Sequence, residues 1–445
     1  MEILIKASQL IMSLSILVVL HELGHFIPAK LFKTRVEKFY LFFDPWFSII
    51  KKKIGNTEYG IGWLPLGGYV KISGMIDESM DKEQMKKPAE PWEFRAKPSW
   101  QRLIIMIGGV TVNLLLGIFI YSMILFSYGE KYLTNDNLTD GIWCVSPLAN
   151  EIGLKNGDKI IKVDDKTPYE FSAVFESFLY AKNVTIERNG NLKDLTLPEN
   201  FISQLLDSEE RILFAPRIPT IISGFSSNSN AKNAGFELND RIIGVNNIET
   251  TYFDEFKGLL EKNKGNFIEV MVWRNNKEVL INVAVTDDGI IGFIPLNPSL
   301  SQLEELEIYS LNSNSFSFLE SIPAGYDLAI KKLSSYISQF KLILSPSTGA
   351  YKGLGGFGTI GNLFPGEWNW PSFWEMTAFL SLMLAFMNIL PIPALDGGHV
   401  VFLIYEMIAG KPAPEKVMEY AQAAGMIFLL SLLVYANGND LLKLF

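Results

Sequence analysis

Three ionisable residues inside an apolar N-terminal stretch form a pattern that can hold a metal ion. The segment His21-Glu22-Leu23-Gly24-His25 matches H-E-x-x-H. On a helix, side chains four residues apart lie nearly one above the other, so both imidazoles can reach one ion. Glu22 can hold a water on that ion and take its proton. The pattern therefore points to metal-assisted hydrolysis of a peptide bond.

The surroundings of this motif argue against a chance match to H-E-x-x-H. Ionisable groups at membrane depth are costly and are seldom present without a use. The chain has only three histidines, two of them in the motif and the third at His399. The plainer interpretation is a polar helix end at the membrane interface with two ordinary histidines.

A catalytic zinc site usually takes three protein ligands and a water, so a third ligand is required. With only His399 to spare, a carboxylate is favoured, and Asp396 in the segment NILPIPALDGGH, which starts at Asn388, is the candidate. Pro391 and Pro393 should break the helix there. Broken backbone at membrane depth is tolerated where it lines a wet cavity, so both prolines are candidate contacts of an unfolded substrate. The alternatives are His399 as the ligand, or a Pro-Asp-Gly turn that merely ends a helix.

The elements that must position these residues are membrane helices. A mean hydropathy of +0.19 with 48% hydrophobic residues is too apolar for an ordinary soluble protein of 445 residues. Crossing a bilayer takes about 20 apolar residues, and the sequence offers stretches 7–29, 103–127, 376–395 and about 421–436. A cleaved signal peptide is disfavoured for the first stretch, because no small-residue cleavage site follows it. The site would then join the first and third of four transmembrane helices.

The distribution of charge predicts an orientation. Residues 28–100 hold 13 Lys and Arg against 9 Asp and Glu, although the whole chain carries a net charge of −9. Positive residues beside membrane helices mark the cytoplasmic side, so we expect this segment and the active site to face the cytoplasm. The middle region and both termini would lie outside it. An acidic chain without a basic-aromatic cluster is not expected to bind nucleic acid, and the single cysteine, Cys144, excludes an intramolecular disulfide.

The middle region contains a repeat. The segment IGLKNGDKIIKVDDK, which starts at Ile152, resembles AGFELNDRIIGVNNI, which starts at Ala234, and Asp158 of the first matches Asp240 of the second. A second similarity follows in VTIERNGN and VMVWRNNK. A repeat of this length indicates two copies of one small domain.

The repeated pattern resembles PDZ domains in the arrangement found in bacterial proteases. Such domains bind extended peptides by adding a strand to a sheet edge; the alternatives are steric gating of substrates or a spacer. The second copy has Asn239 where the first has Gly157, which puts its carboxylate-binding loop in question. Residues 315–345 are predicted to form an amphipathic helix near the membrane surface.

The two motifs together closely resemble the site-2 protease family of intramembrane zinc metalloproteases, over nearly the whole chain. The resemblance implies one zinc ion held by His21, His25 and Asp396, with Glu22 as the catalytic base. It also implies that Asn388 contacts the backbone of the substrate.

The same resemblance implies a membrane-reentrant β-loop after the first helix. Residues 57–74 are Gly-rich and β-like and match it. Its edge near Gly67, Gly68 and Tyr69 would pair with a substrate strand, which supplies hydrogen bonds to an unwound transmembrane helix.

Two family features are altered. The family's G-P-x-x-N pattern in the second helix keeps its Gly (Gly109) and its Asn (Asn113), but Val110 replaces its proline. Before the third helix, the segment GGFG, which starts at Gly355, replaces the family's S-G-P stretch. We expect neither change to touch the metal ligands.

The predicted fold is a polytopic α-helical membrane protein with four transmembrane helices, a membrane-associated β-loop and two inserted PDZ-like α+β domains. Residues 1–128 hold the first two transmembrane helices and the β-loop, and residues 129–218 and 219–300 form the two PDZ-like domains. Residues 301–372 form an amphipathic helical and loop linker, and residues 373–445 hold the last two transmembrane helices. The expected function is an intramembrane zinc endopeptidase of a bacterial inner membrane, with the PDZ-like domains outside the cytoplasm. The resemblance suggests a shortened anti-sigma factor and remnant signal peptides as substrates.

Two other functions compete with this one. The first is a non-proteolytic membrane scaffold that displays tandem PDZ-like domains and keeps a metal for structure. The second is a metal or ion carrier, which would need a continuous polar path that the second and fourth apolar stretches hardly offer.

Overall fold

The chain folds into two compact units. The computed structural model describes residues 2–65, 67–75, 88–179, 181–208, 212–298 and 300–442. The first unit, called here the helical unit, comprises Met1–Gly129, Ser315–Lys341 and Gly353–Phe445, and the second, called the inserted unit, comprises Glu130–Asn314 and Leu342–Lys352.

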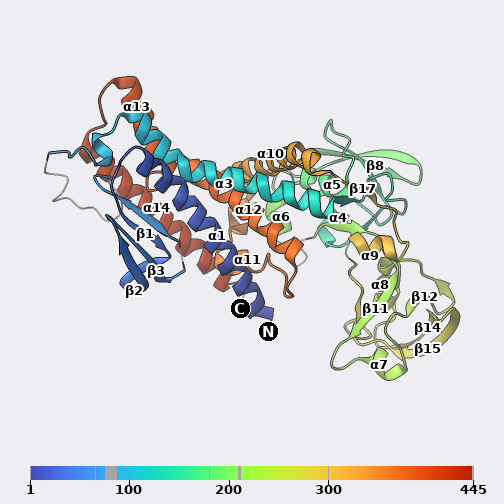
Figure 1. Cartoon of the computed structure of the whole chain (residues 1–445). Coiled ribbons are helices and arrows are strands. Elements are labelled where there is room, and N and C mark those ends of the chain that lie inside the picture. The colour runs from blue at the N-terminus through green and yellow to red at the C-terminus, as the bar shows by residue number, and fades with distance from the viewer. Residues whose placement is uncertain are drawn as a thin grey trace. The chain divides into compact units, whose positions relative to one another are not determined.

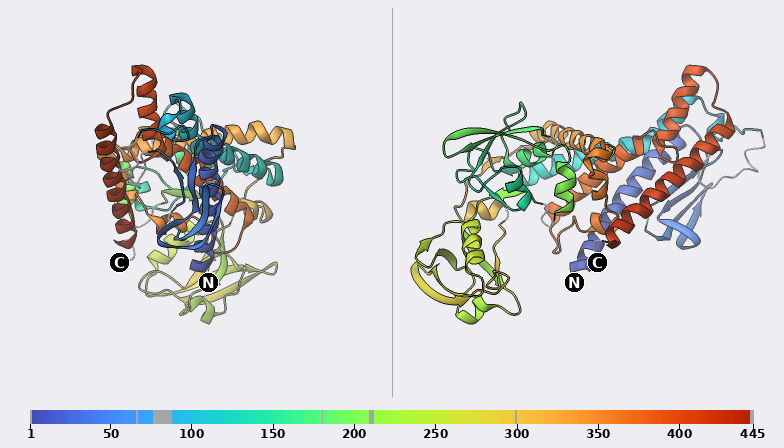
Figure 2. Two further views of the ribbon diagram at one scale, coloured as in Figure 1. Left: turned by 60° about the vertical axis from the view of Figure 1, so that its left-hand side comes forward. Right: turned by 180° about the vertical axis from the view of Figure 1, so that it is seen from behind.

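Four helices of the helical unit are long and apolar enough to cross a membrane, which confirms the four predicted stretches. They are α1 (Glu2–Leu31), α3 (Ser99–Tyr128), α12 (Trp370–Ile389) and α14 (Glu415–Leu442). Helix α3 packs along both α1 and α12 (Figure 1). Both chain termini lie at the same end of this unit (Figures 1 and 2), as an even number of crossings requires.

Helices α1 and α3 meet backbone to backbone next to the histidine motif. A Cβ atom on Gly24 would overlap the carbonyl group of Gly108, and one on Gly108 would overlap the carbonyl oxygen of Gly24. Small residues at a crossing let membrane helices approach this closely. The contact brings the wall of α3 directly against His25.

The third apolar stretch is broken, as its two prolines predicted. Helix α12 ends at Ile389, and after a turn that contains Pro391 and Pro393 a further helix, α13 (Asp396–Ala409), begins. No pattern in the sequence had predicted α13. Its first residue is Asp396, so the candidate third ligand lies where a new helix starts rather than in a terminal turn.

A four-stranded sheet follows α1 and is larger than the predicted β-loop. It contains β1 (Val36–Leu41), β2 (Phe43–Ile54), β3 (Thr57–Leu64) and β4 (Tyr69–Ile72), in the order β2-β3-β1-β4. The predicted loop 57–74 supplies only β3 and β4. Strand β4 pairs with β1 on one side and forms an edge of the described sheet, and both strands contact α1 (Figure 1).

The inserted unit contains two separate hydrophobic cores. The first is built mainly from buried residues between Leu133 and Phe214, together with Leu303 and Tyr309, and the second from residues between Ile222 and Val285 with Ile291. Elements of the first are β5 (Glu130–Tyr132), β6 (Ile142–Cys144), α4 (Pro147–Glu151), β7 (Lys159–Val163), α5 (Phe171–Phe178), β8 (Asn183–Arg188), β9 (Asn191–Thr196), α6 (Phe201–Asp207), β10 (Phe214–Pro216), α9 (Leu300–Glu305) and β17 (Asn312–Asn314). Elements of the second are β11 (Thr220–Phe225), α7 (Asn230–Ala234), β12 (Arg241–Val245), β13 (Ile248–Glu249), α8 (Phe253–Lys262), β14 (Phe267–Arg274), β15 (Lys277–Ala284) and β16 (Phe293–Pro295).

The two copies of the repeat use their matching residues in the same way. In the first, Arg188 donates two hydrogen bonds of 2.7 Å to the buried carboxylate of Asp158 and one to the carbonyl of Gly153. In the second, Arg274 contacts the carboxylate of Asp240 and the carbonyl of Gly235 with the same atoms. The sequence repeat is therefore a structural repeat.

The difference at Asn239 does not change the backbone. Gly157 has a φ of 87° and Asn239 a φ of 68°, so both occupy the left-handed region. Asparagine tolerates this region better than most residues with a Cβ, which explains why it can stand in for glycine.

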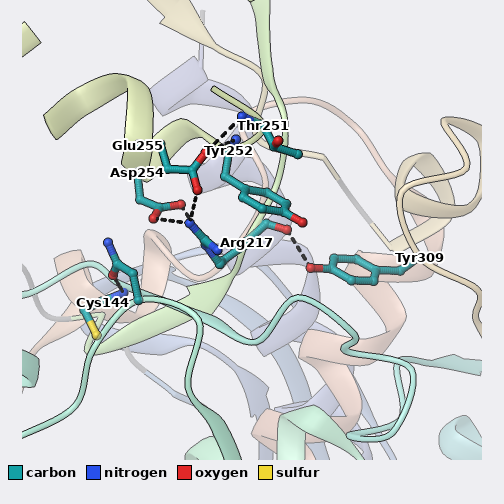
Figure 3. Close-up of polar contacts among 8 residues, drawn as sticks. Cys144, Arg217, Thr251, Tyr252, Asp254, Glu255 and Tyr309 are labelled. Atoms are coloured by element: carbon teal, nitrogen blue, oxygen red, sulfur yellow. Dashed lines mark hydrogen bonds and ion pairs between the residues drawn. The ribbon is translucent and has the colours of Figure 1, made fainter. Parts of the chain in front are cut away.

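One arginine ties the two cores of the inserted unit together. The guanidinium of Arg217 forms hydrogen bonds with Asp254 and Glu255 and lies 4.1 Å from the ring centre of Tyr252 (Figure 3). The hydroxyl of Tyr309 donates a 2.6 Å hydrogen bond to the carbonyl of Arg217. Arg217 and Asp254 have little exposure, so their pair fixes the junction more firmly than a surface ion pair would, whereas Glu255 is more exposed.

Helix α10 (Phe318–Ile343) belongs to the helical unit, where Ala329 and Tyr336 pack with buried residues of α3 and α12. The short helix α11 (Phe357–Gly361) begins within the altered GGFG stretch and contains its last two residues. The carboxylate of Asp440 on α14 accepts hydrogen bonds from the backbone of Gly356 and Thr359. The replacement of the S-G-P stretch by GGFG therefore affects the packing of α11 against α14. The remaining described elements are the 3₁₀ helices η1 (Phe94–Ala96), η2 (Pro346–Thr348) and η3 (Ala350–Gly353).

Candidate metal centre

The structure brings the two histidines of the motif together with Asp396, about 370 residues further along the chain. The Nε2 atoms of His21 and His25 lie 3.3 Å apart, and each lies 3.3 Å from Oδ2 of Asp396. Ligands held tetrahedrally at about 2.0–2.1 Å from a zinc ion lie about 3.3–3.4 Å from one another. The three donor atoms therefore have the spacing that one zinc ion requires.

Hydrogen bonding to the second nitrogen of His25 fixes which nitrogen faces Asp396. Nδ1 of His25 lies 2.8 Å from the carbonyl oxygen of Ile105 on α3, so this nitrogen carries the proton and donates it. Nε2 then presents a lone pair. Oδ2 of Asp396 is buried and has no hydrogen-bond partner among the described residues. Lone pairs that converge in a buried place are stabilised by a cation, which is the observation that fits a metal here.

The second nitrogen of His21 contacts Asn113, another residue of α3. The amide of Asn113 lies 3.2 Å from Nδ1 of His21. A metal on Nε2 needs the proton on Nδ1, so this nitrogen must donate and Asn113 must present its oxygen. Rotating the Asn113 amide by half a turn places its Oδ1 where the Nδ1 proton of His21 can be donated to it. This buried oxygen otherwise has no hydrogen-bond partner among the described residues.

Gly109 provides the room that the donors occupy. A Cβ atom at this position would overlap Nε2 of His25 and lie 2.6 Å from Cε1 of His21. Helix α3 thus supports both histidines, through Gly109, Asn113 and the carbonyl of Ile105. Gly109 and Asn113 were noted in the sequence only as the retained residues of the altered G-P-x-x-N pattern, without a role at the metal ligands. Only the packing of α3 against α1 reveals this role.

The donors open into a pocket of about 670 Å³ in the helical unit. Glu22 lines this pocket together with both histidines and Asp396, as do Tyr69, Val70, Lys71 and Ile72 of the edge strand β4. The backbone of Val70 approaches the carboxyl group of Glu22. The cavity is therefore faced by a carboxylate, by three potential metal ligands and by a strand edge that pairs with no other strand among the described residues.

The predicted substrate contacts are distributed unevenly around this cavity. Gly68 and Tyr69 line it, whereas Gly67 lines a separate apolar pocket of about 320 Å³ beside α1 and α12. A Cβ on Gly68 would lie 2.6 Å from the side chain of Val18, so this glycine lets the strand approach α1. Tyr69 stacks on Tyr40 and its hydroxyl donates a 2.8 Å hydrogen bond to Asp44, so its ring is already held in place.

The remaining predicted contacts lie outside the cavity wall. Asn388 is at the end of α12, and Pro391 and Pro393 lie in the turn before α13; the wall from this turn is formed by Ala394 and Leu395. His399, the alternative third ligand, lines the cavity, but the donor group found among the described residues contains Asp396.

Comparison with known proteins agrees with this geometry. The model of peptidase family M50 matches residues 9–432. The "Regulator of sigma E protease" of Haemophilus influenzae is 27% identical over 473 residues, which cover 100% of both chains. The "Regulator of sigma-E protease RseP" of Escherichia coli is 27% identical over 454 residues, which cover 98% of both chains.

Proposed function

The chain belongs to peptidase family M50 and is a zinc metalloprotease, and we propose that it cuts single-pass membrane proteins within or near the bilayer. The observation that carries this proposal is the triangle of His21, His25 and Asp396, which joins the membrane-crossing helix α1 to the first residue of α13, just after the membrane-crossing helix α12. A soluble zincin would not need its site in such helices.

We assign His21, His25 and Asp396 as the ligands of one zinc ion. A zinc ion held there supplies Lewis-acid polarisation of a water and of the scissile carbonyl. The three ligands are placed by different means. Ile105 and Asn113 orient the two imidazoles, and the first turn of α13 carries the carboxylate.

Glu22 is assigned as the catalytic base. Its carboxylate takes a proton from the attacking water and gives it to the nitrogen of the leaving peptide, as general acid–base catalysis requires. Its place between the histidines in sequence, and on the wall of the same cavity, supports this role.

Strand β4 is assigned as the template for the substrate. A transmembrane helix must unwind before a peptide bond is accessible, and the freed backbone groups then need partners inside the bilayer. An edge strand supplies them by β-addition. The edge of β4 beside Glu22, which pairs with no other strand among the described residues, supports this assignment, and Gly68 and Tyr69, which line the same cavity, are proposed as contacts of the substrate backbone.

The place of the protein in the cell follows from its relatives and its charges. We propose a bacterial inner-membrane protein that acts on an anti-sigma factor, because two similar proteins carry the name "Regulator of sigma E protease". The basic segment 28–100 favours an active site on the cytoplasmic side, with the inserted unit on the other. The two repeated domains are proposed to be PDZ-like, and to exclude intact substrates or bind their peptides.

Cleavage of a model substrate tests this function. The full-length protein in proteoliposomes should cut a single-pass membrane peptide that lacks a folded outer domain, and Glu22→Gln should lower the rate by about 10²–10⁴-fold, the range for loss of a general base. The zinc content of the variant should stay unchanged. Equal cleavage by both proteins would remove Glu22 as the base, and no cleavage by the wild type would favour the scaffold, which has no use for a base.

A further inference from the structure

The strongest site outside the catalytic cavity is a cluster of basic residues where α1 ends. A pocket of about 410 Å³, called here the basic pocket, is lined by Lys30, Lys33, Thr34, Arg35, Asn56 and Trp92. Three of these six residues are cationic and none is acidic. From this chemistry we propose that the basic pocket binds the phosphate group of an anionic phospholipid.

The charges of the basic pocket form no ion pair within the described part of the chain, although the Nζ atom of Lys30 lies 5.3 Å from the ring centre of Phe26. Lys30, Lys33 and Arg35 take part in none of the ion pairs found among the described residues. The Nζ atom of Lys30 donates one hydrogen bond, of 2.8 Å, to Thr57, which leaves two of its three protons for a ligand. Nearby acids are engaged otherwise, since Glu93 pairs with Arg95 and Glu58 accepts a hydrogen bond from Tyr40.

A second, independent observation concerns Thr34 in the wall of the basic pocket. Its side chain is only 2% exposed, and its hydroxyl has no hydrogen-bond partner among the described residues. Leaving a buried hydroxyl without a partner is costly. An acceptor in the basic pocket, such as a phosphate oxygen, would supply one after a rotation of the side chain.

The C-terminal end of α1, beside the basic pocket, would by itself disfavour a bound anion. The C-terminus of α1 carries roughly half a negative elementary charge. Its last carbonyls already accept hydrogen bonds from the backbone of Phe32, Lys33 and Thr34. Three full positive charges outweigh this partial charge, so the net field in the basic pocket attracts anions.

The apolar residues at its rim indicate a lipid rather than a free anion as the source of the phosphate. Ile27 and Leu31 on the last turns of α1, and Ile54 at the tip of the β2–β3 hairpin, expose more than half of their side chains. Trp92 adds an exposed indole, the side chain favoured at the membrane interface. An anionic headgroup could occupy the basic pocket while its acyl chains cover these apolar side chains.

Lipid retention by the full-length protein tests this proposal. The wild type, the double variant Lys33→Gln/Arg35→Gln, and the control Lys51→Gln/Lys52→Gln would be purified from vesicles of phosphatidylcholine and phosphatidylglycerol. Native mass spectrometry would count the phosphatidylglycerol molecules retained. The control removes the same charge from exposed positions of β2 that do not line the basic pocket.

We expect the wild type and the control to retain one phosphatidylglycerol, which the pocket variant loses. The affinity of the pocket variant for phosphatidylglycerol should be lower by roughly thirtyfold, because two basic contacts with the lipid are removed. Equal loss from both variants would show attraction by total charge, and no loss from either would show that no site exists; both results overturn the proposal. Only backbone atoms of Arg35 bond to Trp92 and Ser73, so folding should survive. The charge-preserving variant Lys33→Arg/Arg35→Lys should restore retention, and a failure to restore it would also count against the site.

A second arm separates the two sources of phosphate. The same proteins in discs of phosphatidylcholine alone would be titrated with inorganic phosphate while their melting temperature is followed. We expect no difference between wild type and pocket variant. A rise seen only in the wild type would assign the basic pocket to free phosphate and overturn the lipid as its ligand.

Discussion

At the scale of single residues, the metal centre depends on groups that never touch the metal. The carbonyl of Ile105 and the amide of Asn113 bond to the nitrogens of His25 and His21 that face away from Asp396. Such partners fix the orientation and the protonation of ligating histidines. The H-E-x-x-H motif therefore works only when α3 lies against it.

Two substitutions of Asn113 test this dependence. Asn113→Leu removes the acceptor for the Nδ1 proton of His21 and should weaken zinc binding about 10–100-fold. Asn113→Asp keeps an oxygen at the same place and should retain zinc. Affinity would be measured by competition with a chelator, with Leu115→Ala at an exposed position of α3 as the control. Zinc loss in Asn113→Asp with retention in Asn113→Leu would show that Asn113 is not an acceptor.

At the scale of elements, the break between α12 and α13 places the third ligand. The turn is held by α14, where a Cβ atom on Gly425 would overlap the carbonyl of Pro393. The amide nitrogen of Ala394 also donates a 3.3 Å hydrogen bond to Gln422 of α14. Helix α14 thus supports Asp396 without contributing a ligand.

A matched pair of substitutions on α14 tests this support. Gly425→Ala should push the Pro393 turn away and lower both zinc content and cleavage, because Asp396 starts the next helix. Gly438→Ala places the same methyl group where no atom lies within 4 Å and should behave like the wild type. The zinc contents of the two variants would be compared at equal protein concentration. An unchanged zinc content in Gly425→Ala would mean that the Pro393 turn keeps its position without support from α14.

The elements also show what the sequence could and could not predict. Elimination among three histidines led to Asp396, and hydropathy found the four long helices, because both depend on composition and local pattern. The role of Asn113 could not be found in this way, since it arises from the packing of α3 on α1. Helix α13 was missed because the two prolines predicted the break in the third apolar stretch, but no new helix was predicted after it.

At the scale of the whole molecule, the two ends of the long segment Glu130–Asn314 of the inserted unit meet, and the short segment Leu342–Lys352 completes this unit. Strand β17, near the end of the insertion, pairs with β5 at its beginning. The buried side chains of Leu303 and Tyr309 join the first core. A clean removal must therefore extend beyond residue 300, to Asn314.

Deleting residues 130–314 tests the proposed gating. If the two repeated domains exclude substrates by size, the shortened protein should cut membrane proteins with intact outer domains that the full chain leaves uncut. Cleavage of a peptide without an outer domain should remain, because the metal centre belongs to the helical unit. Gel analysis of both substrates would show the difference. Unchanged resistance of the intact substrate, with the short peptide still cut, would contradict gating.

The most direct test of the central claim is the zinc content of purified Asp396→Ala beside the wild type. The wild type should hold one zinc ion per chain, and Asp396→Ala should lose most of it, because two histidines alone do not complete the site. His399→Ala is the control and should keep its zinc. A full load in Asp396→Ala, or a loss in His399→Ala alone, would contradict the assignment of Asp396 as the third ligand.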